Sequence, residues 1–170
     1  YADPLSLPLL KHLGPMQFHF LTGVLDSQRS DVASPLYTAM RLSMRPTPAL
    51  EIGLSRAAQW GGQGRDQSFQ AFFDMLVGDD NQIGGSAEEQ PGNQLAGYDA
   101  RWQSPLFQLP YAVYAQLIGE DEADSLPIKF IGLGGVEIWC GWGESSWRGG
   151  LEYADTAVDF YQAPQFNIAY

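Results

Sequence analysis

The sequence contains a single cysteine, few charged residues and no long hydrophobic run. Cys140 alone can form neither an internal disulfide nor a cysteine-based zinc site. Charged residues make up 17% of the chain, whereas soluble domains contain roughly 25%. Even IKFIGLGGVEIWCGW is interrupted by Lys129, Glu137 and glycines, so no stretch approaches the ~18 apolar residues of a transmembrane helix. A transmembrane β-barrel is still allowed, because its strands need only about ten residues of alternating character.

Basic residues are the scarcer of the charged types. Nine Lys and Arg stand against 20 Asp and Glu, which gives a net charge of −11. This charge repels polyphosphate and no Lys/Arg cluster offsets it, so nucleic acid is not an expected partner. No positively charged segment followed by an apolar one marks a signal peptide, and the chain begins at Tyr1. We expect any export signal to have been cleaved or to lie outside this sequence.

Glycine and aromatic residues, in contrast, are abundant. The chain has 19 Gly, five Trp, eight Tyr and nine Phe, which fits a β-protein with curved strands whose side chains meet an interface. Alternation with a period of two predicts strands over residues 16–26, 35–45, 50–57, 94–103, 111–119, 128–139 and 146–157. Pro46 and Pro48 are expected to end the second strand and form a short turn.

A long polar connection over residues 58–93 interrupts this pattern. Within it, Phe69, Phe72, Phe73 and Leu76 recur at helical spacing, with Asp66 placed to cap the helix and Gly78 to end it. We therefore expect one short amphipathic helix in a long loop. If the strands run up and down, this connection shares one end of the sheet with DSQRSDVAS and EDEADSLP, and the short turns share the other. Such asymmetry is typical of outer-membrane barrels.

Alternation alone does not decide which face is which, because a soluble antiparallel sheet alternates as well. In a barrel, Leu42, Met44 and Ile52 would face lipid, and the charged residues would line a polar lumen. Arg and Glu recur on one face together with Gly and Ser, which favours the lumen. The residues predicted to face it are Arg41, Arg45, Glu51, Asp99, Arg101, Arg148 and Glu152.

Five sequence blocks stand out in order along the chain: PLYTAMRLSMRPTPALEIGLSRAAQWGGQGR, GDDN, PGNQLAGYDARW, YAQLIGEDEA and LEYADT. Together they resemble the Wzi capsule-assembly family of Gram-negative outer-membrane proteins. The resemblance implies an all-β, antiparallel, up-and-down transmembrane barrel of about eighteen strands in the cell outer membrane. It also implies lectin-like binding of capsular or exopolysaccharide. The chain has about seven of these strands. We therefore expect residues 1–170 to be a single partial barrel domain, an internal fragment completed by further strands, because open sheet edges are costly in lipid.

Candidate glycan-binding residues lie where predicted strands meet long loops. SRAAQWGGQGRD offers an aromatic ring, amides and guanidinium groups, which stack on sugar faces, bond hydroxyls and pair with uronates. A packed Trp in an interfacial girdle with Arg in lumen ion pairs is the alternative. Acidic loops at DDNQIGG and GEDEADS match no calcium motif, so no metal or cofactor is predicted. The candidates are Arg56, Gln59, Trp60, Arg65, Asn81, Asn93, Glu120 and Asp121.

The sequence supports a catalytic function less well than it supports glycan binding. The strand carboxylates Glu51, Asp99, Glu137 and Glu152 could include a glycosidase pair, but they are equally suited to pair with arginines in a lumen. His12 and His19 are isolated, which gives a Ser/His/Asp site no support. We expect a non-enzymatic protein whose partners are polysaccharide and outer-membrane lipid. A soluble β-rich carbohydrate-active enzyme and a diffusion channel are the alternatives.

Overall fold

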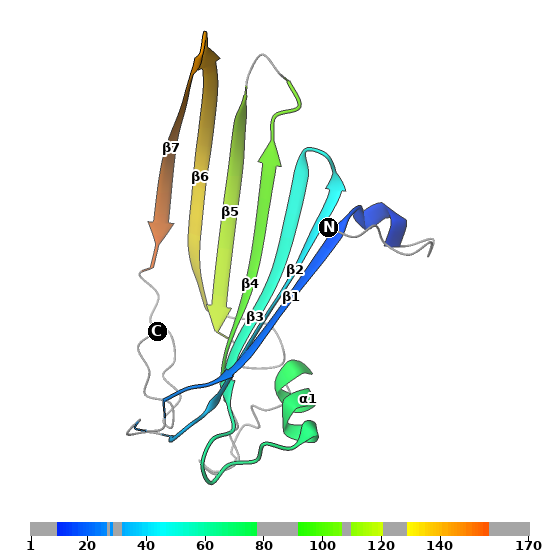
Figure 1. The fold of residues 1–170 in the computed structure, drawn as a ribbon, viewed down its shortest axis with the longest axis vertical. Helices are drawn as coiled ribbons and strands as arrows, with labels where there is room; N and C mark the ends of the chain where they lie inside the picture. The colour runs from blue at the N-terminus through cyan, green and yellow to red at the C-terminus, as the bar shows by residue number, and fades with distance from the viewer. Residues whose placement is uncertain are drawn as a thin grey trace.

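A computed structural model describes residues 10–26, 28, 32–77, 92–106, 110–120 and 129–156. Seven strands form one antiparallel sheet in chain order (Figure 1). They are β1 (Met16–Val24), β2 (Leu36–Thr47), β3 (Leu50–Trp60), β4 (Gly92–Gln103), β5 (Tyr111–Glu120), β6 (Lys129–Trp142) and β7 (Ser145–Asp155). A 3-10 helix, η1 (Leu10–Leu13), precedes β1, and an α-helix, α1 (Phe69–Val77), follows β3. All seven predicted strands are confirmed, with ends shifted by three residues or fewer.

The sheet is an up-and-down meander that is open at both sides. Within the described residues β1 pairs with β2 alone and β7 with β6 alone. Strands β1, β3 and β5 finish at one end of the sheet, which we call the loop end. Strands β2, β4 and β6 finish at the opposite end, the turn end (Figure 1). Two of the connections at the turn end are tight, at Pro48–Ala49 and Gly143–Glu144. The predicted separation of long and short connections is therefore confirmed.

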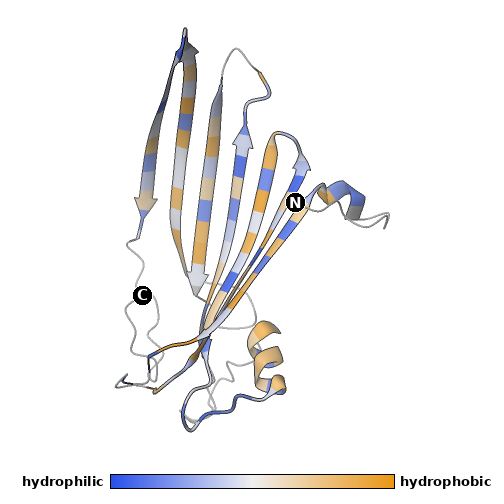
Figure 2. Ribbon diagram, in the orientation of Figure 1, coloured by the Kyte–Doolittle hydropathy of each residue, from blue (hydrophilic) through white to orange (hydrophobic). Residues whose placement is uncertain are grey.

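Strand pairing fixes which residues share a face, because successive side chains point to opposite sides of a sheet. Leu42 lies opposite Leu54, Leu54 opposite Tyr98, and Tyr98 opposite Leu117. We call the side that carries this row the apolar face. One residue along, Arg41 lies opposite Ser55 on the other side, the polar face. Figure 2 shows the resulting alternation of hydrophobic and hydrophilic bands along the strands.

The apolar face is uncovered over much of its area. Phe18 is 62% exposed, Leu117 47% and Leu151 74%. Leu42, Met44 and Ile52 are half-buried. A soluble sheet would bury this face in a core. Among the described residues, the buried hydrophobic cluster lies under α1 and does not include Leu42, Met44 or Ile52.

The turn between β2 and β3 differs from the prediction in one respect. Pro46 does not end the strand, because β2 continues to Thr47 with a register shift between Met44 and Thr47. A bulge tolerates a residue that has no N–H to donate. The turn itself lies at Pro48 and Ala49, as predicted, and the Leu50 N–H closes it by donating to Thr47 Oγ1 at 3.1 Å.

Helix α1 confirms the predicted helix in the long connection, but the capping residue is different. The Ala71 N–H donates to Ser68 Oγ at 3.2 Å, so Ser68 caps the helix. Asp66 supports it, because its carboxylate accepts hydrogen bonds from the backbone N–H and the hydroxyl of Ser68. The predicted stop at Gly78 lies outside the described residues. No helix in the described part of the chain is long and apolar enough to span a membrane.

Candidate functional site: the polar face of the sheet

The centre of the polar face is occupied by an ion pair that crosses a strand. Arg41 on β2 binds Asp99 on β4 through two hydrogen bonds, Nη1 to Oδ2 at 2.5 Å and Nη2 to Oδ1 at 2.8 Å. The guanidinium passes over β3, where it also donates to Ser55 Oγ at 3.0 Å. Gly53 lies directly beneath, and a Cβ there would collide with Asp99 Oδ2 and Arg41 Nη2. The glycine thus leaves room for a side chain to reach the next strand but one.

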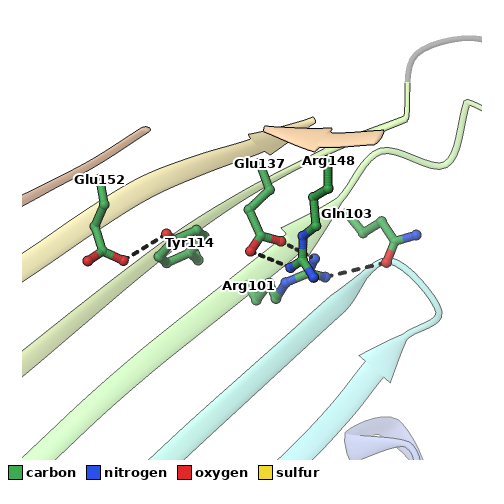
Figure 3. A network of polar contacts seen from close by, with 6 residues as sticks. All are labelled: Arg101, Gln103, Tyr114, Glu137, Arg148 and Glu152. Carbon is green, nitrogen blue, oxygen red and sulfur yellow. Dashed lines mark hydrogen bonds and ion pairs between the residues drawn. The ribbon is translucent and has the colours of Figure 1, made fainter. Parts of the chain in front are cut away.

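A second pair of side chains also meets across an intervening strand. The Tyr114 hydroxyl on β5 donates to Glu152 Oε2 on β7 at 2.8 Å (Figure 3). Its ring lies over Gly135 of β6, and a Cβ at that glycine would collide with the ring. Gly135 is paired with Tyr114 on one side and Glu152 on the other. Both glycines are therefore required by the long side chains above them, and neither requires an unusual backbone conformation.

Glu137 on β6 joins two arginines from different strands (Figure 3). Arg101 Nη2 donates to Glu137 Oε2 at 3.0 Å, and Arg148 Nη2 donates to Glu137 Oε1. Nearer the turn end, Arg45 Nε donates to Glu51 Oε2 at 3.0 Å. Each arginine predicted for this face is therefore engaged by a carboxylate.

Two hollows lie side by side on this face. The first is polar and is lined by Arg41, Asp99, Arg101, Tyr114, Gln116 and Glu137, among others. The second lies closer to the loop end and shares Arg41 and Gln116, but its further lining includes Leu21, Ala39, Leu95 and Ile118. The polar face is thus charged in the middle of the sheet and less polar toward the loop end.

The seven residues predicted to face a lumen all lie on the polar face. Strand pairing places six of them there, and Arg45, which lies in the register shift, is placed there by its bond to Glu51. The sequence alone did not identify Tyr114, Ser55 or the two spacer glycines as parts of this network. Their signal is a glycine paired directly with a long polar side chain, which is visible only once the register is known.

The glycan candidates from SRAAQWGGQGRD are divided between the two faces. Arg56 lies on the apolar face and donates through Nε to Gln94 Oε1 at 2.9 Å. Trp60 lies on the same face and is only 6% exposed, because α1 covers it. Its ring is therefore not free to stack on a sugar, and this part of the prediction does not fit the structure.

Gln59 lies on the polar face instead, at the loop end. It is buried, and within the described part of the chain its Oε1 has no hydrogen-bond partner. Arg65 is half-buried in the connection after β3. The backbone pairing places Asn93 opposite Gln59, and Glu120 opposite Leu95. Asn81 and Asp121 lie outside the described residues.

Comparison with known proteins identifies the family. The family model described as capsule assembly protein Wzi matches residues 1–170. The chain belongs to the Wzi family. A Klebsiella pneumoniae protein described as an uncharacterised 55.8 kDa protein in the cps region is 37% identical over 151 residues, which cover 88% of this chain and 29% of that protein.

A solved structure agrees with this assignment. It is the Escherichia coli Wzi, described as an outer-membrane protein involved in group 1 capsule assembly and as a carbohydrate-binding β-barrel. The match has a TM-score of 0.71 and 34% identity, and it covers 91% of this chain and 31% of the Escherichia coli chain. The seven strands therefore form part of an outer-membrane Wzi barrel, and the chain spans about a third of the length of these relatives.

Proposed function

We propose that the Wzi protein to which this chain belongs binds capsular or exopolysaccharide at the cell surface and helps to assemble it there, without catalysing a reaction on it. One observation carries the proposal: 91% of the chain matches a barrel that is itself described as carbohydrate-binding. The rest of the barrel, supplied by further strands of the same protein, pairs with the open edges of β1 and β7, because unpaired edges are costly in lipid.

In this proposal the apolar face meets the acyl chains and the polar face lines the barrel interior. The exposure of Phe18, Leu117 and Leu151 supports the first part, because these side chains would be unfavourable in water. The ion pairs support the second, because a charged side chain at the bilayer midplane costs about 2–4 kcal/mol. The loop end faces outward, since outer-membrane barrels have long loops outside and short turns inside.

The polysaccharide contacts are proposed at the loop end of the polar face. Gln59 is kept as a candidate although it is only 5% exposed, because among the described residues its Oε1 has no partner, and a sugar hydroxyl or a water that reached it would satisfy this acceptor. Arg65, Asn93 and Glu120 remain candidates from their positions nearby, and Asn81 and Asp121 from the sequence. Arg56 and Trp60 are left out of the proposed site because they lie on the apolar face.

The absence of catalysis is part of the proposal. It is supported by the side chains that the strand carboxylates bind. A retaining glycosidase needs two carboxyl groups about 5 Å apart, one of them free to protonate the leaving group. Here Asp99 binds Arg41, Glu51 binds Arg45, and Glu137 bridges two arginines. These pairings engage the carboxylates as structural partners of the arginines, and Glu152 accepts the hydrogen bond of the Tyr114 hydroxyl.

Binding of acidic capsular polymers to the complete protein in detergent tests the proposal. We expect Gln59→Ala to weaken binding about five- to tenfold, which corresponds to the loss of one hydrogen bond. Gln17→Ala is the matched control, because Gln17 lies on the same face at the turn end. No binding by the unaltered protein would refute the function, and equal effects of the two variants would refute the location. New reducing ends on the polymer would indicate an enzyme instead.

A further inference from the structure

Helix α1 packs on the apolar face of the sheet, at the loop end. Its Ala71 and Met75 are buried against Ala58 and Trp60 of β3. The Trp60 and Phe72 rings lie 5.7 Å apart between centroids. The Trp60 indole N–H donates to Thr38 Oγ1 at 3.0 Å, which holds the indole on this face. The helix is thus attached to the side of the sheet that carries the uncovered apolar residues.

A second side of α1 is aromatic and faces away from the sheet. Phe69 is 76% exposed and Phe73 is 43% exposed. Their rings contact each other edge to face at 4.8 Å between centroids. The neighbouring side is polar, where Gln70 Nε2 donates to Asp74 Oδ1 at 2.7 Å. The helix is thus amphipathic, with no Lys or Arg on its polar side, and aromatic residues opposite a polar side also occur in helices that lie in the plane of a membrane interface.

The position of α1 along β3 determines how deep the helix would lie in the membrane. On the apolar face, β3 carries Leu54, then Arg56, then Ala58, toward the loop end. An arginine on the lipid side is costly at the midplane but nearly neutral at the interface, to which its side chain can reach. Arg56 therefore marks the edge of the hydrocarbon layer on this strand. Because α1 packs on Ala58 and Trp60, it lies just beyond that edge.

We propose that α1 is an interfacial helix that inserts Phe69 and Phe73 into the lipid at the loop-end boundary of the barrel. The partner of the two rings is the membrane itself, because α1 packs on the apolar face beyond Arg56 and leaves both rings exposed. The proposal rests on the proposed orientation of that face. Its consequence is that the described part of the connection after β3, residues 61–77, is held against the membrane surface beside the proposed polysaccharide site.

Fluorescence quenching in the complete barrel, reconstituted in phospholipid vesicles, tests this. The exposed Cys140 is first replaced by Ser. An environment-sensitive fluorophore is then attached at Phe69→Cys or, in a second variant, at Phe73→Cys. Gln70→Cys on the polar side of the helix is the matched control, and Leu117→Cys on the apolar face is the reference for lipid contact. The quenchers are lipids brominated near the headgroup or deep in the chain, and aqueous iodide.

We expect the labels at positions 69 and 73 to be quenched by the shallow brominated lipid several-fold more than the label at position 70, and to be protected from iodide. Strong quenching by iodide at 69 and 73 would place the rings in water and overturn the proposal. Quenching by neither agent would show that another protein segment covers them and would also overturn it. If Leu117→Cys is quenched by lipid, such a result concerns the helix alone; if it is not, the orientation of the sheet is wrong.

Discussion

Gly53→Ala is expected to destabilise the barrel through the ion pair above it. Alanine itself suits a strand better than glycine by about 0.5–1 kcal/mol. The added Cβ, however, would fall on Arg41 Nη2 and Asp99 Oδ2. The pair would have to move away and lose at least part of its two-bonded geometry.

The size of the loss follows from the geometry of the pair. Its side chains are 34% and 20% exposed, so solvent weakens the interaction only in part. Exposed ion pairs contribute about 0.2–1 kcal/mol and hydrogen bonds to charged groups about 1.5–3 kcal/mol, so we assign roughly 1.5–2 kcal/mol to this one. After subtraction of the gain from alanine, Gly53→Ala should cost about 1 kcal/mol.

A mutant cycle separates the gain from alanine in the strand from the loss of the Arg41–Asp99 ion pair. In a background that carries Arg41→Ala and Asp99→Ala, the pair is absent, and Gly53→Ala should stabilise the protein by about 0.5 kcal/mol. The assay is urea unfolding of the complete barrel in detergent micelles at fixed ionic strength, followed by tryptophan fluorescence. Gly97→Ala is the control on the same face, because the nearest atom to its added Cβ would be 3.6 Å away. An equal cost of Gly53→Ala in both backgrounds would refute the explanation.

Three further changes give distinct expected results. Tyr114→Phe removes the bond to Glu152 and should cost about 0.5–1.5 kcal/mol in the same unfolding assay; no change would mean that the ring packing alone matters. Arg101→Gln leaves the Glu137 carboxylate with one arginine and should cost about 1 kcal/mol, less at high salt; a salt-independent loss would contradict an ionic origin. Met75→Ala opens a cavity beneath α1, because Met75 is 0% exposed, and should make the connection after β3 more sensitive to protease. An unchanged cleavage rate would show that the helix is held by other contacts.

The strands could be predicted because the alternation is regular and each one is bounded by turn residues. The pairing across the sheet could not, since it depends on the exact register. Arg41 reaches Asp99 because Gly53 lies opposite Asp99 in the β3–β4 pair. The position of Arg41 opposite Ser55 depends on the β2–β3 register, which contains the shift between Met44 and Thr47. The prediction at Pro46 was wrong for the same reason, because a bulge in the strand is not visible in the sequence pattern.

The candidate glycan site was predicted as one group because its residues are close in sequence. Alternation already separates Gln59 from Arg56 and Trp60, so a stricter use of the period of two would have divided the group. The burial of Trp60 could not be deduced in this way. It depends on α1 folding back onto the apolar face, which is a tertiary contact.

The orientation of the two faces is the central claim, and two arginine substitutions at adjacent positions of β5 test it most directly. Leu117 lies on the apolar face and Gln116 on the polar face. In lipid vesicles, Leu117→Arg should lower the free energy of unfolding of the complete barrel by about 2 kcal/mol or more. Gln116→Arg should lower it by less than about 1 kcal/mol. A larger loss for Gln116→Arg, or equal losses at the two positions, would contradict an apolar face in lipid and a polar face inside the barrel.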